Sequence, residues 1–500
     1  MLRDNPLQYF DLAQARTAVN VVGNYTLALD VQVVAAALET VILIIVVFTA
    51  LGVESFGWKL RTVAGNLAAV AVAGVLVYVW IPTVGNFSNL QIISREKGYL
   101  LSFASFIKMG QVKRPEGYSA QAAGEALAPF EYEGAGEGNT PNIIVIMDEA
   151  FADLPDLYGF ETDVDVLPNI HSMTENTIHG RVLVSVYGGG TANTEYEFLT
   201  GNSLHFFPMG SSPYVQYTGS RQQSLAWKLS EMGYSHMGYH PYLAISYRRA
   251  VAYPFLGLTP FYSIDDELPY EDCLRSYVSD RSDFQNVIHL YEEREPGQPF
   301  FIFNVTMQNH GGYSLEKPEI RAAVKPEDEA LQKPSLLEYL ALIHETDAAF
   351  GELVDYFSGV KEDTIILMFG DHQPSMEADI ADTMDRYLKE KNGMADLQGR
   401  YYSTFVMWAN FDMEEKTDVV TSPNYLRSML LDQAGVKLNA YEKFLLELSR
   451  EYPAINAYGF LDHEGEWHSR EESAGGMLEQ YQYLVYNNVF DKKNVIAGYE

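Results

Sequence analysis

The sequence predicts an α/β fold in which a mostly parallel sheet is sandwiched between helices, with a transmembrane helical hairpin before it. From Pro141 onward, short β-rich runs alternate with helical patterns, and the runs are almost continuously apolar. Such alternation is typical of a parallel sheet flanked by helices, and apolar strands indicate a sheet that is covered on both faces. Two long apolar stretches near the N-terminus indicate the hairpin.

The two apolar stretches suggest a division of the chain into three parts. Val33 to Val53 and Val63 to Pro82 are about as long as a membrane span, and Glu39 is the only charge in them. A buried hairpin in a soluble protein is the alternative, but core helices are seldom this long and uncharged. The predicted parts are a membrane region (1–98), an interfacial helix and linker (99–140), and a globular domain (141–500).

Positive charges near these stretches bear on the topology of the hairpin. Lys59 and Arg61 favour a cytoplasmic connecting loop, with both ends of the hairpin outside the cell. Arg95 and Lys97 follow the second stretch and weaken that bias. Residues 1–30 show no secretory signal, because no basic start leads into a short apolar core. We therefore expect further membrane spans upstream of this sequence.

Composition narrows the class of partner. The net charge of −33 repels the phosphates of nucleic acids, so we expect no DNA or RNA partner. The same charge repels anionic lipids and polymers, so an anionic substrate requires a local cation in its binding site. Cys273 is the only cysteine, which excludes an internal disulfide framework but leaves the compartment open.

Polar side chains follow four of the predicted strands. The strands cover 143–147, 182–186, 300–305 and 364–369. The residues that follow them include, in the same order, Glu149, Thr191, His310, and the pair Asp371 and His372. Because parallel strands end at one edge of a sheet, we expect these side chains to converge there, although each alone is an ordinary turn or capping residue. Their mixture of oxygen and nitrogen ligands suits Mn²⁺, Zn²⁺ or Mg²⁺.

Thr191 is the strongest candidate for a reacting group. It follows three glycines and precedes a helical pattern, so its hydroxyl is expected near a helix N-terminus, where backbone N–H groups favour an anion such as phosphate. A plain helix cap is the alternative, and Thr194 fills that role equally well. A threonine hydroxyl is a weak nucleophile, so we expect a metal ion held by the neighbouring carboxylates and imidazole to activate it.

A second cluster follows the strand predicted at 235–239. It contains His240, Tyr247, Arg248 and Arg249. An arginine can grip a phosphate with two hydrogen bonds, and an aromatic ring can pack against glycerol or lipid. From the residues alone, a surface loop with solvated arginines is the favoured interpretation.

Taken together, five segments resemble the lipoteichoic acid synthase family, a branch of the alkaline phosphatase and sulfatase superfamily. They are NIIVIMDEAFADL, YGGGTANTEYEFLTGNS, GYHPYLAISYRR, VTMQNHGGYS and FGDHQPS, and they occur in the family's order. The resemblance runs from about Asn24 through most of the C-terminal region. It implies an alkaline phosphatase/sulfatase-like fold for residues 141–500.

The resemblance also implies roles for individual residues. Four positions match those that bind a catalytic Mn²⁺: Glu149, Thr191, Asp371 and His372. Others match substrate-binding positions around phosphate and glycerol: His240, Tyr247, Arg249 and His310. Thr191 matches the nucleophile that takes glycerol phosphate from phosphatidylglycerol and passes it to a glycolipid or polyglycerol-phosphate acceptor in lipoteichoic acid synthesis. Family members are multi-pass proteins of the cell membrane of Gram-positive-type bacteria, with an extracellular catalytic domain.

Three departures from the family pattern leave the acceptor open. Tyr247 stands where the family often has Trp, Arg248 where Asn is common, and Ala150 where a Ser often follows the metal-binding Glu. Primases, polymerising synthases and related phosphoglycerol transferases all share the motifs, so the motifs do not separate these activities.

Three rival functions fit the sequence less well. A sulfatase-type hydrolase needs a Cys or Ser in a Cys/Ser-x-Pro-x-Arg context, and Cys273 in DCLRSYV does not provide it. Phosphoethanolamine transferases often carry disulfides, which a single cysteine cannot form within one chain. A catalytically dead membrane sensor would have no need to retain all four metal-binding positions.

Overall fold

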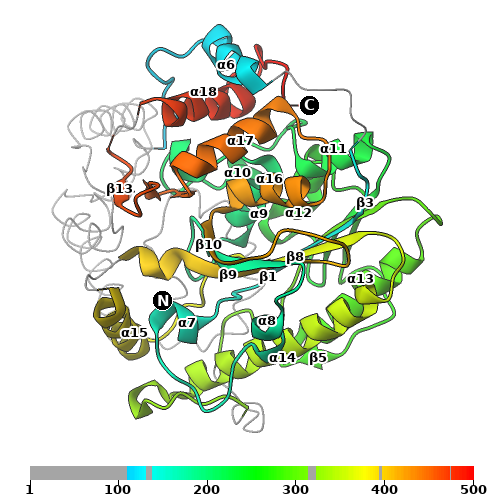
Figure 1. The fold of residues 1–500 in the computed structure, drawn as a ribbon, viewed down its shortest axis with the longest axis vertical. Coiled ribbons are helices and arrows are strands. Elements are labelled where there is room, and N and C mark those ends of the chain that lie inside the picture. Colours follow the sequence, from blue (N-terminus) through cyan, green and yellow to red (C-terminus); the bar gives the residue numbers. More distant parts are fainter. Residues whose placement is uncertain (1–109, 131–137, 314–322, 393–396, 473–474, 500) are drawn as a thin grey trace, which may run out of the picture. The chain divides into compact units, whose positions relative to one another are not determined.

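A computed structural model describes residues 110–130, 138–313, 323–392, 397–472 and 475–499. These residues form a fold built around one eight-stranded sheet (Figure 1). The predicted membrane spans at 33–53 and 63–82, and the interfacial segment 99–109, lie outside the described residues. Among the residues that are described, no helix combines the length and the apolar character that a bilayer crossing requires.

The large sheet is mostly parallel, as the sequence predicts. Its strands are β1 (Asn142–Asp148), β2 (Thr177–Leu183), β3 (Ser235–His240), β4 (Phe261–Ser263), β7 (Phe300–Val305), β8 (Thr364–Gly370), β9 (Tyr402–Ala409) and β10 (Lys416–Thr421). Their order across the sheet is β10-β2-β9-β8-β1-β7-β3-β4. Only β9 runs antiparallel to its neighbours, β2 and β8. The carboxyl ends of β1, β2, β3, β7 and β8 therefore meet at one edge.

Helices cover both faces of this sheet (Figure 1). One layer contains α6 (Ala120–Leu127), α9 (Thr191–Thr200), α10 (Pro213–Gln216), α11 (Leu225–Glu231), α12 (Arg249–Phe255), α16 (Pro423–Gln433), α17 (Ala440–Glu451) and α18 (Met477–Val489). The other contains α7 (Leu154–Tyr158), α8 (Pro168–Ser172), α13 (Asp280–Glu292), α14 (Pro334–Ser358) and α15 (Ala378–Asn392). Small sheets are formed by β5 (Cys273–Leu274) with β6 (Tyr277–Val278), and by β11 (Ala454–Asn456), β12 (Gly459–Leu461) and β13 (Trp467–Ser469).

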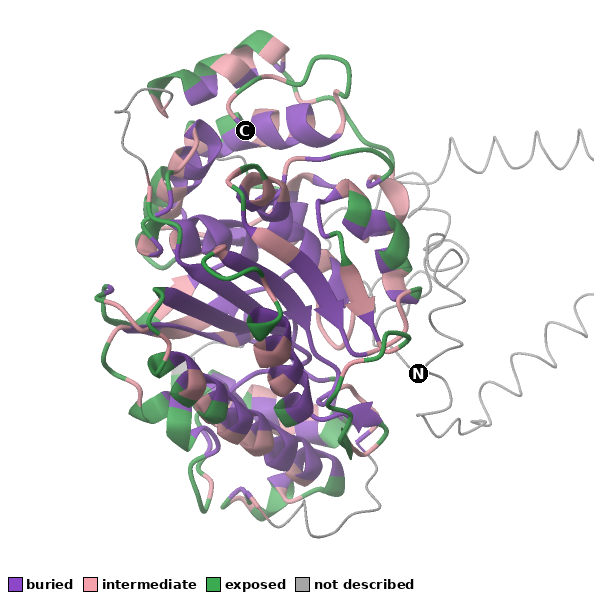
Figure 2. Cartoon of the chain, turned by 90° about the vertical axis from the view of Figure 1, so that its right-hand side faces the viewer, coloured by how far each residue is buried: buried purple, intermediate pink, exposed green. Residues whose placement is uncertain are grey.

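Side chains that alternate along each strand belong to two hydrophobic cores, one on each face of the sheet. In β1, Ile143, Val145 and Met147 join the core under one helix layer, whereas Ile144 and Ile146 join the other. Successive side chains of a strand point to opposite faces, so a strand buried on both sides must be apolar throughout. Figure 2 shows the central strands buried and the exposed residues on the outer helices and loops.

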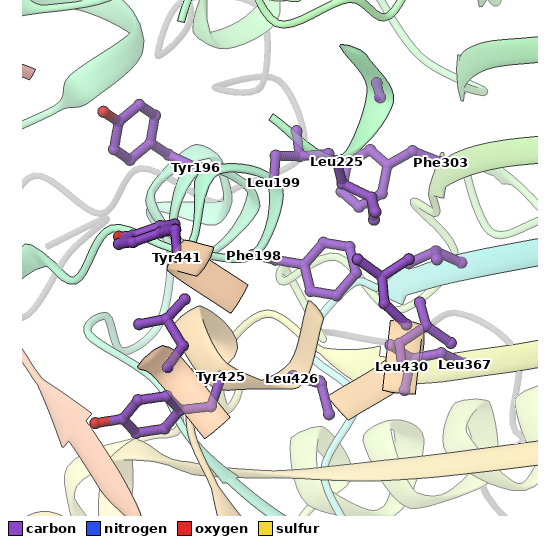
Figure 3. Close-up of a cluster of buried hydrophobic side chains, with 14 of the residues drawn as sticks. Tyr196, Phe198, Leu199, Leu225, Phe303, Leu367, Tyr425, Leu426, Leu430 and Tyr441 are labelled. Carbon is purple, nitrogen blue, oxygen red and sulfur yellow. The ribbon is translucent and has the colours of Figure 1, made fainter. Parts of the chain in front are cut away.

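Buried aromatic contacts pack helix α9 against the sheet. The ring of Phe198 lies 5.8 Å from that of Phe303 on β7 (Figure 3). It also lies 5.0 Å from the ring of Phe369 on β8. Leu426 and Leu430 of α16 belong to the same core. Buried aromatic contacts of this kind restrict the helix strongly, so the position of its first residue, Thr191, is well defined.

Two segments differ from the sequence prediction. The strand predicted at 182–186 instead covers Thr177–Leu183, so only 182 and 183 are shared. After Leu183 the chain leaves the ladder, although the Val184 N–H still donates to the Tyr401 carbonyl (2.8 Å). Part of the stretch predicted as a linker forms α6, whose Ala123, Ala126 and Leu127 are buried against the core. Ser119 starts this helix by accepting a hydrogen bond from the Ala122 N–H.

Candidate active site

Strand ends bring three of the predicted metal ligands together. Glu149 follows β1, and Asp371 and His372 follow the adjacent strand β8. His372 Nε2 lies 3.2 Å from Asp371 Oδ2 and 3.8 Å from Glu149 Oε1. All three side chains are buried, and one ligand atom of each lies within 4.8 Å of the others. The expected convergence at one edge of the sheet is therefore present in the structure.

The chemistry of this group fits a divalent cation. Asp371 Oδ2 and His372 Nε2 are buried and make no hydrogen bond within the described residues. His372 Nδ1 donates to the Gln373 carbonyl (3.0 Å), so Nε2 carries the lone pair that a metal needs. Asp371 Oδ1 accepts from the Ala150 N–H (2.8 Å), which orients the carboxylate. Buried lone pairs without a partner cost free energy, and a bound cation would offset that cost.

The electrostatics of the two carboxylates support the same conclusion. Burial raises the pKa of Glu149 well above its usual value, and the nearby Asp371 raises it further. Burial likewise raises the pKa of Asp371. Two buried carboxylates side by side resist ionisation, and a bound cation supplies the charge that offsets this cost.

Thr191 faces this group from the first position of α9. Its Oγ1 lies 3.4 Å from Glu149 Oε2 and is buried. Thr194, the other candidate in the same turn, instead donates to the Asp371 carbonyl (2.8 Å) and so holds the β8 loop in place. Of the two threonines, Thr191 thus has the hydroxyl directed at the metal-ligand group.

The glycine turn before Thr191 has a steric cause. Gly188, Gly189 and Gly190 all have positive φ, at 62°, 137° and 104°. A Cβ at Gly188 would lie 2.8 Å from the Cβ of Ser375, so the turn can pass this close to the β8 loop only without a side chain. The turn places the N-terminus of α9, which is the positive end of the helix dipole, beside the metal-ligand group.

In the second cluster His240 and Arg249 are buried, so the surface-loop interpretation is wrong for Arg249. Its side chain is 2% exposed and pairs with the fully buried Glu195 on α9. Arg249 Nε lies 3.0 Å from Glu195 Oε1, and Arg249 Nη1 lies 2.9 Å from His240 Nε2. Arg248 is exposed and donates to the Val215 carbonyl. The sequence could not show that Arg249 is buried and Arg248 exposed, because no pattern indicates that the first residue of α12 is buried.

His240 is held in one neutral form. Its Nδ1 donates to the Val305 carbonyl (2.7 Å), which leaves Nε2 to accept from Arg249. Burial and the Arg249 charge both lower its pKa well below the usual value. An imidazole so held orients the guanidinium and carries no charge of its own.

Tyr247 and His310 complete the predicted set. Tyr247 has a φ of 51°, and its hydroxyl accepts from the Gly190 N–H (3.3 Å) at the start of α9. His310 is partly exposed, with Nδ1 3.1 Å from the Tyr277 hydroxyl. Burial lowers the pKa of His310 to about 4. Positive φ in a tyrosine costs about 1 kcal/mol or more of conformational free energy.

Comparison with known proteins identifies the family. The model of the family described as Sulfatase matches residues 141–436, which is more than half of the chain. The chain belongs to the sulfatase family. Its fold is accordingly of the sulfatase type.

Two curated relatives of this sulfatase-family chain come from Rhizobium meliloti. A protein described as a cyclic beta-1,2-glucan modification protein is 29% identical over 408 residues, which cover 80% of this chain and 62% of the relative. The capsular polysaccharide biosynthesis protein RkpI is 27% identical over 262 residues, 51% of this chain and 45% of the relative. The chain therefore spans less than two thirds of the length of either relative.

Solved structures share the sulfatase-family fold at low identity. The phosphoglycerol transferase GacH of Streptococcus pyogenes, in complex with sn-glycerol-1-phosphate, has a TM-score of 0.63 at 19% identity, over 77% of this chain and 97% of that one. The lipoteichoic acid synthase LtaP of Listeria monocytogenes has a TM-score of 0.54 at 14% identity, over 73% and 95%. These likenesses establish the fold.

Sequence reasoning missed Glu195 in this sulfatase-family site. Its carboxylate accepts from Arg249 and from the hydroxyls of Tyr214 (3.1 Å) and Tyr253 (2.7 Å). It therefore fixes the guanidinium that in turn contacts His240. A glutamate on a helix carries no sequence signal that separates this role from a solvated one.

Replacing Glu195 with glutamine is expected to loosen Arg249. The substitution leaves a buried guanidinium without a counter-charge, which costs about 3 kcal/mol of unfolding free energy. Misplacement of Arg249 should lower kcat/KM for an anionic substrate about 10- to 100-fold. Glu197→Gln is the matched control, because Glu197 is equally buried on α9 but accepts from the Leu204 N–H instead. Equal kinetic losses in both variants would show that Glu195 acts only through stability.

Proposed function

We propose that this protein transfers glycerol phosphate from phosphatidylglycerol to a hydroxyl-bearing acceptor through an intermediate on Thr191. The observation that carries the proposal is the Thr191 hydroxyl, which lies at a helix N-terminus and faces two buried carboxylates and an imidazole. A phosphate reaching Thr191 meets backbone N–H groups on one side and the metal-ligand group on the other.

In the proposed site, different residues bind the metal ion and the substrate. Thr191 and the three ligands Glu149, Asp371 and His372 would hold the cation, for which Mn²⁺ is proposed and Mg²⁺ or Zn²⁺ also fit the donor set. When bound, such an ion supplies positive charge that makes the threonine hydroxyl easier to deprotonate. In this proposal Arg249, which contacts His240, would bind the phosphate, and Tyr247 and His310 would bind the glycerol.

Two displacements at phosphorus complete the proposed reaction. The Thr191 oxygen bonds to phosphorus as the bond from phosphorus to the diacylglycerol oxygen breaks. The proton that the threonine hydroxyl loses ends on that oxygen, which leaves as diacylglycerol. The acceptor hydroxyl then bonds to phosphorus, Thr191 leaves, and the acceptor's proton returns to the threonine oxygen. No oxidant or further substrate is required.

The names of similar proteins support a transferase that acts on glycans. GacH is a phosphoglycerol transferase bound to sn-glycerol-1-phosphate, and LtaP is a lipoteichoic acid synthase. The Rhizobium relatives are named for glucan modification and capsular polysaccharide biosynthesis. A glycolipid or polyglycerol-phosphate acceptor at the outer face of the cell membrane, as in lipoteichoic acid synthesis, fits within this range.

Mass analysis of the Thr191 peptide tests donor and nucleophile together. The protein is incubated with Mn²⁺ and phosphatidylglycerol carrying an isotope-labelled headgroup, quenched in acid and digested. We expect one labelled glycerol phosphate on Thr191 and release of diacylglycerol. A parallel reaction with phosphatidylethanolamine is the control, and an adduct formed only from that lipid would replace the proposal with phosphoethanolamine transfer. A label on another residue would refute the role of Thr191.

A further inference from the structure

Three partly exposed tyrosines lie beside the glycine turn. Tyr187, Tyr401 and Tyr458, together with Arg400, are here named the tyrosine platform. The rings of Tyr401 and Tyr458 lie 4.7 Å apart at 42°, and the Arg400 guanidinium lies 5.9 Å from the ring of Tyr187. These residues come from three segments far apart in the sequence, so the fold has to assemble the group.

Backbone contacts join the platform to the catalytic residues. Gln373, next to the metal ligand His372, donates through Nε2 to the carbonyls of Gly399 (2.8 Å) and Tyr402 (2.6 Å), and so brackets Arg400 and Tyr401. The Gln373 carbonyl accepts from the Gly188 N–H (3.1 Å), which is next to Tyr187. The same short stretch of chain therefore positions the platform, the nucleophile turn and a metal ligand.

The third ring is fixed by the small C-terminal sheet. Tyr458 lies in the turn between β11 and β12. The Ala457 N–H before it donates to Ser185 Oγ (3.1 Å), and Asn456 Nδ2 donates to the Val184 carbonyl (3.2 Å). Both acceptors precede the glycine turn, so Tyr458 is tied to the chain that leads to Thr191.

The exposure and charge of the platform indicate the class of ligand. A tyrosine has an apolar ring and a polar tip, which suits the C–H faces and hydroxyls of a sugar. Arg400 is already paired with Asp385, its Nε lying 3.1 Å from Oδ1, so it offers hydrogen bonds with little net charge. The chain's charge of −33 also repels a polyanion such as polyglycerol phosphate. A neutral carbohydrate fits both observations better than an anionic polymer.

We infer that the tyrosine platform is the acceptor subsite and binds a neutral carbohydrate, whose hydroxyl then attacks the phosphorus on Thr191. This inference rests on the proposed function. The attack forms a sugar-oxygen-to-phosphorus bond and breaks the bond from phosphorus to the Thr191 oxygen, which receives the sugar's proton. Tyr187, four residues before Thr191 in the chain, is the nearest platform residue to the nucleophile in sequence.

Variants of the tyrosine platform should weaken binding of the carbohydrate acceptor without affecting the reaction with the lipid donor. With phosphatidylglycerol and a neutral β-linked gluco-oligosaccharide, Tyr458→Ala is expected to raise KM for the oligosaccharide about tenfold. Release of glycerol phosphate to water and the yield of the Thr191 adduct should stay unchanged. Tyr187→Ala, from a separate segment, should behave alike if one variant folds poorly. Tyr356→Ala is the matched control, because Tyr356 is partly exposed near the C-terminal end of α14 and lies outside the platform.

A binding assay without turnover distinguishes failure of the carbohydrate subsite from failure of the proposed reaction. Titration of the protein with the oligosaccharide alone should show weaker binding in both platform variants and unchanged binding in Tyr356→Ala. Equal binding in all proteins, or wild-type transfer that prefers a glycerol-phosphate oligomer, would overturn the platform as a carbohydrate subsite. Absence of the Thr191 adduct with intact oligosaccharide binding would instead count against the proposed function and leave the subsite supported.

Discussion

Thr191→Ala is expected to lower kcat by about 10⁴-fold or more, because the variant lacks the oxygen that bonds to phosphorus. The loss should appear in both transfer and hydrolysis, since each passes through the same intermediate. The fold should survive, because the hydrogen bond from the Thr191 hydroxyl to Glu149 is long, at 3.4 Å. Loss of such a bond costs about 1 kcal/mol at most. Release of diacylglycerol from labelled phosphatidylglycerol measures the effect.

Thr194→Ala is the control for this prediction. Both threonines lie buried in the first turn of α9, but the Thr194 hydroxyl holds the Asp371 carbonyl and does not face the ligands. A shift of the β8 loop should reduce turnover moderately, while the adduct still forms on Thr191. If Thr194→Ala lost activity and Thr191→Ala kept it, the roles of the two hydroxyls would have to be exchanged.

Most of the fold was predicted from the spacing of apolar residues along the sequence. The strands at β1, β7 and β8 and the long helix α14 were predictable because each is a continuous apolar or amphipathic run. The antiparallel direction of β9 was not predictable, because an apolar strand has the same sequence pattern in parallel and antiparallel pairing. The end of β2 was misplaced because Val184 remains apolar and buried after it leaves the ladder.

The site was predictable where residue type and strand ends coincide. Glu149, Asp371 and His372 each follow a strand, and strand order then brings them together. Glu195 was missed because its role depends on the guanidinium that reaches it from α12. The tyrosine platform was missed for a related reason: its rings meet only through the Gln373 and Ala457 contacts, which no local pattern encodes.

Removal of the divalent cation is expected to reduce turnover to background, and returning Mn²⁺ should restore it. Without the ion, Glu149 and Asp371 lie side by side in a buried site with no cation among the ligands themselves. Metal should therefore also stabilise the fold, by about 2.7 kcal/mol of unfolding free energy at a hundredfold excess over Kd. Activity and thermal unfolding, each measured after chelation and after titration with Mn²⁺, Mg²⁺ or Zn²⁺, test both effects.

Variants test whether the ion acts at Glu149, Asp371 and His372. Asp371→Asn should lose both turnover and the metal-dependent rise in Tm, because it removes a charged ligand. Thr191→Ala should lose turnover but keep most of that rise, since three ligands remain. His171→Ala is the control, because His171 bridges Asp153 and Asp165 outside the ligand group and should leave both responses intact. A chelated protein that turns over at the full rate would exclude a metal-dependent nucleophile, whereas a Tm response in Asp371→Asn equal to that of the wild type would move the ion to another site.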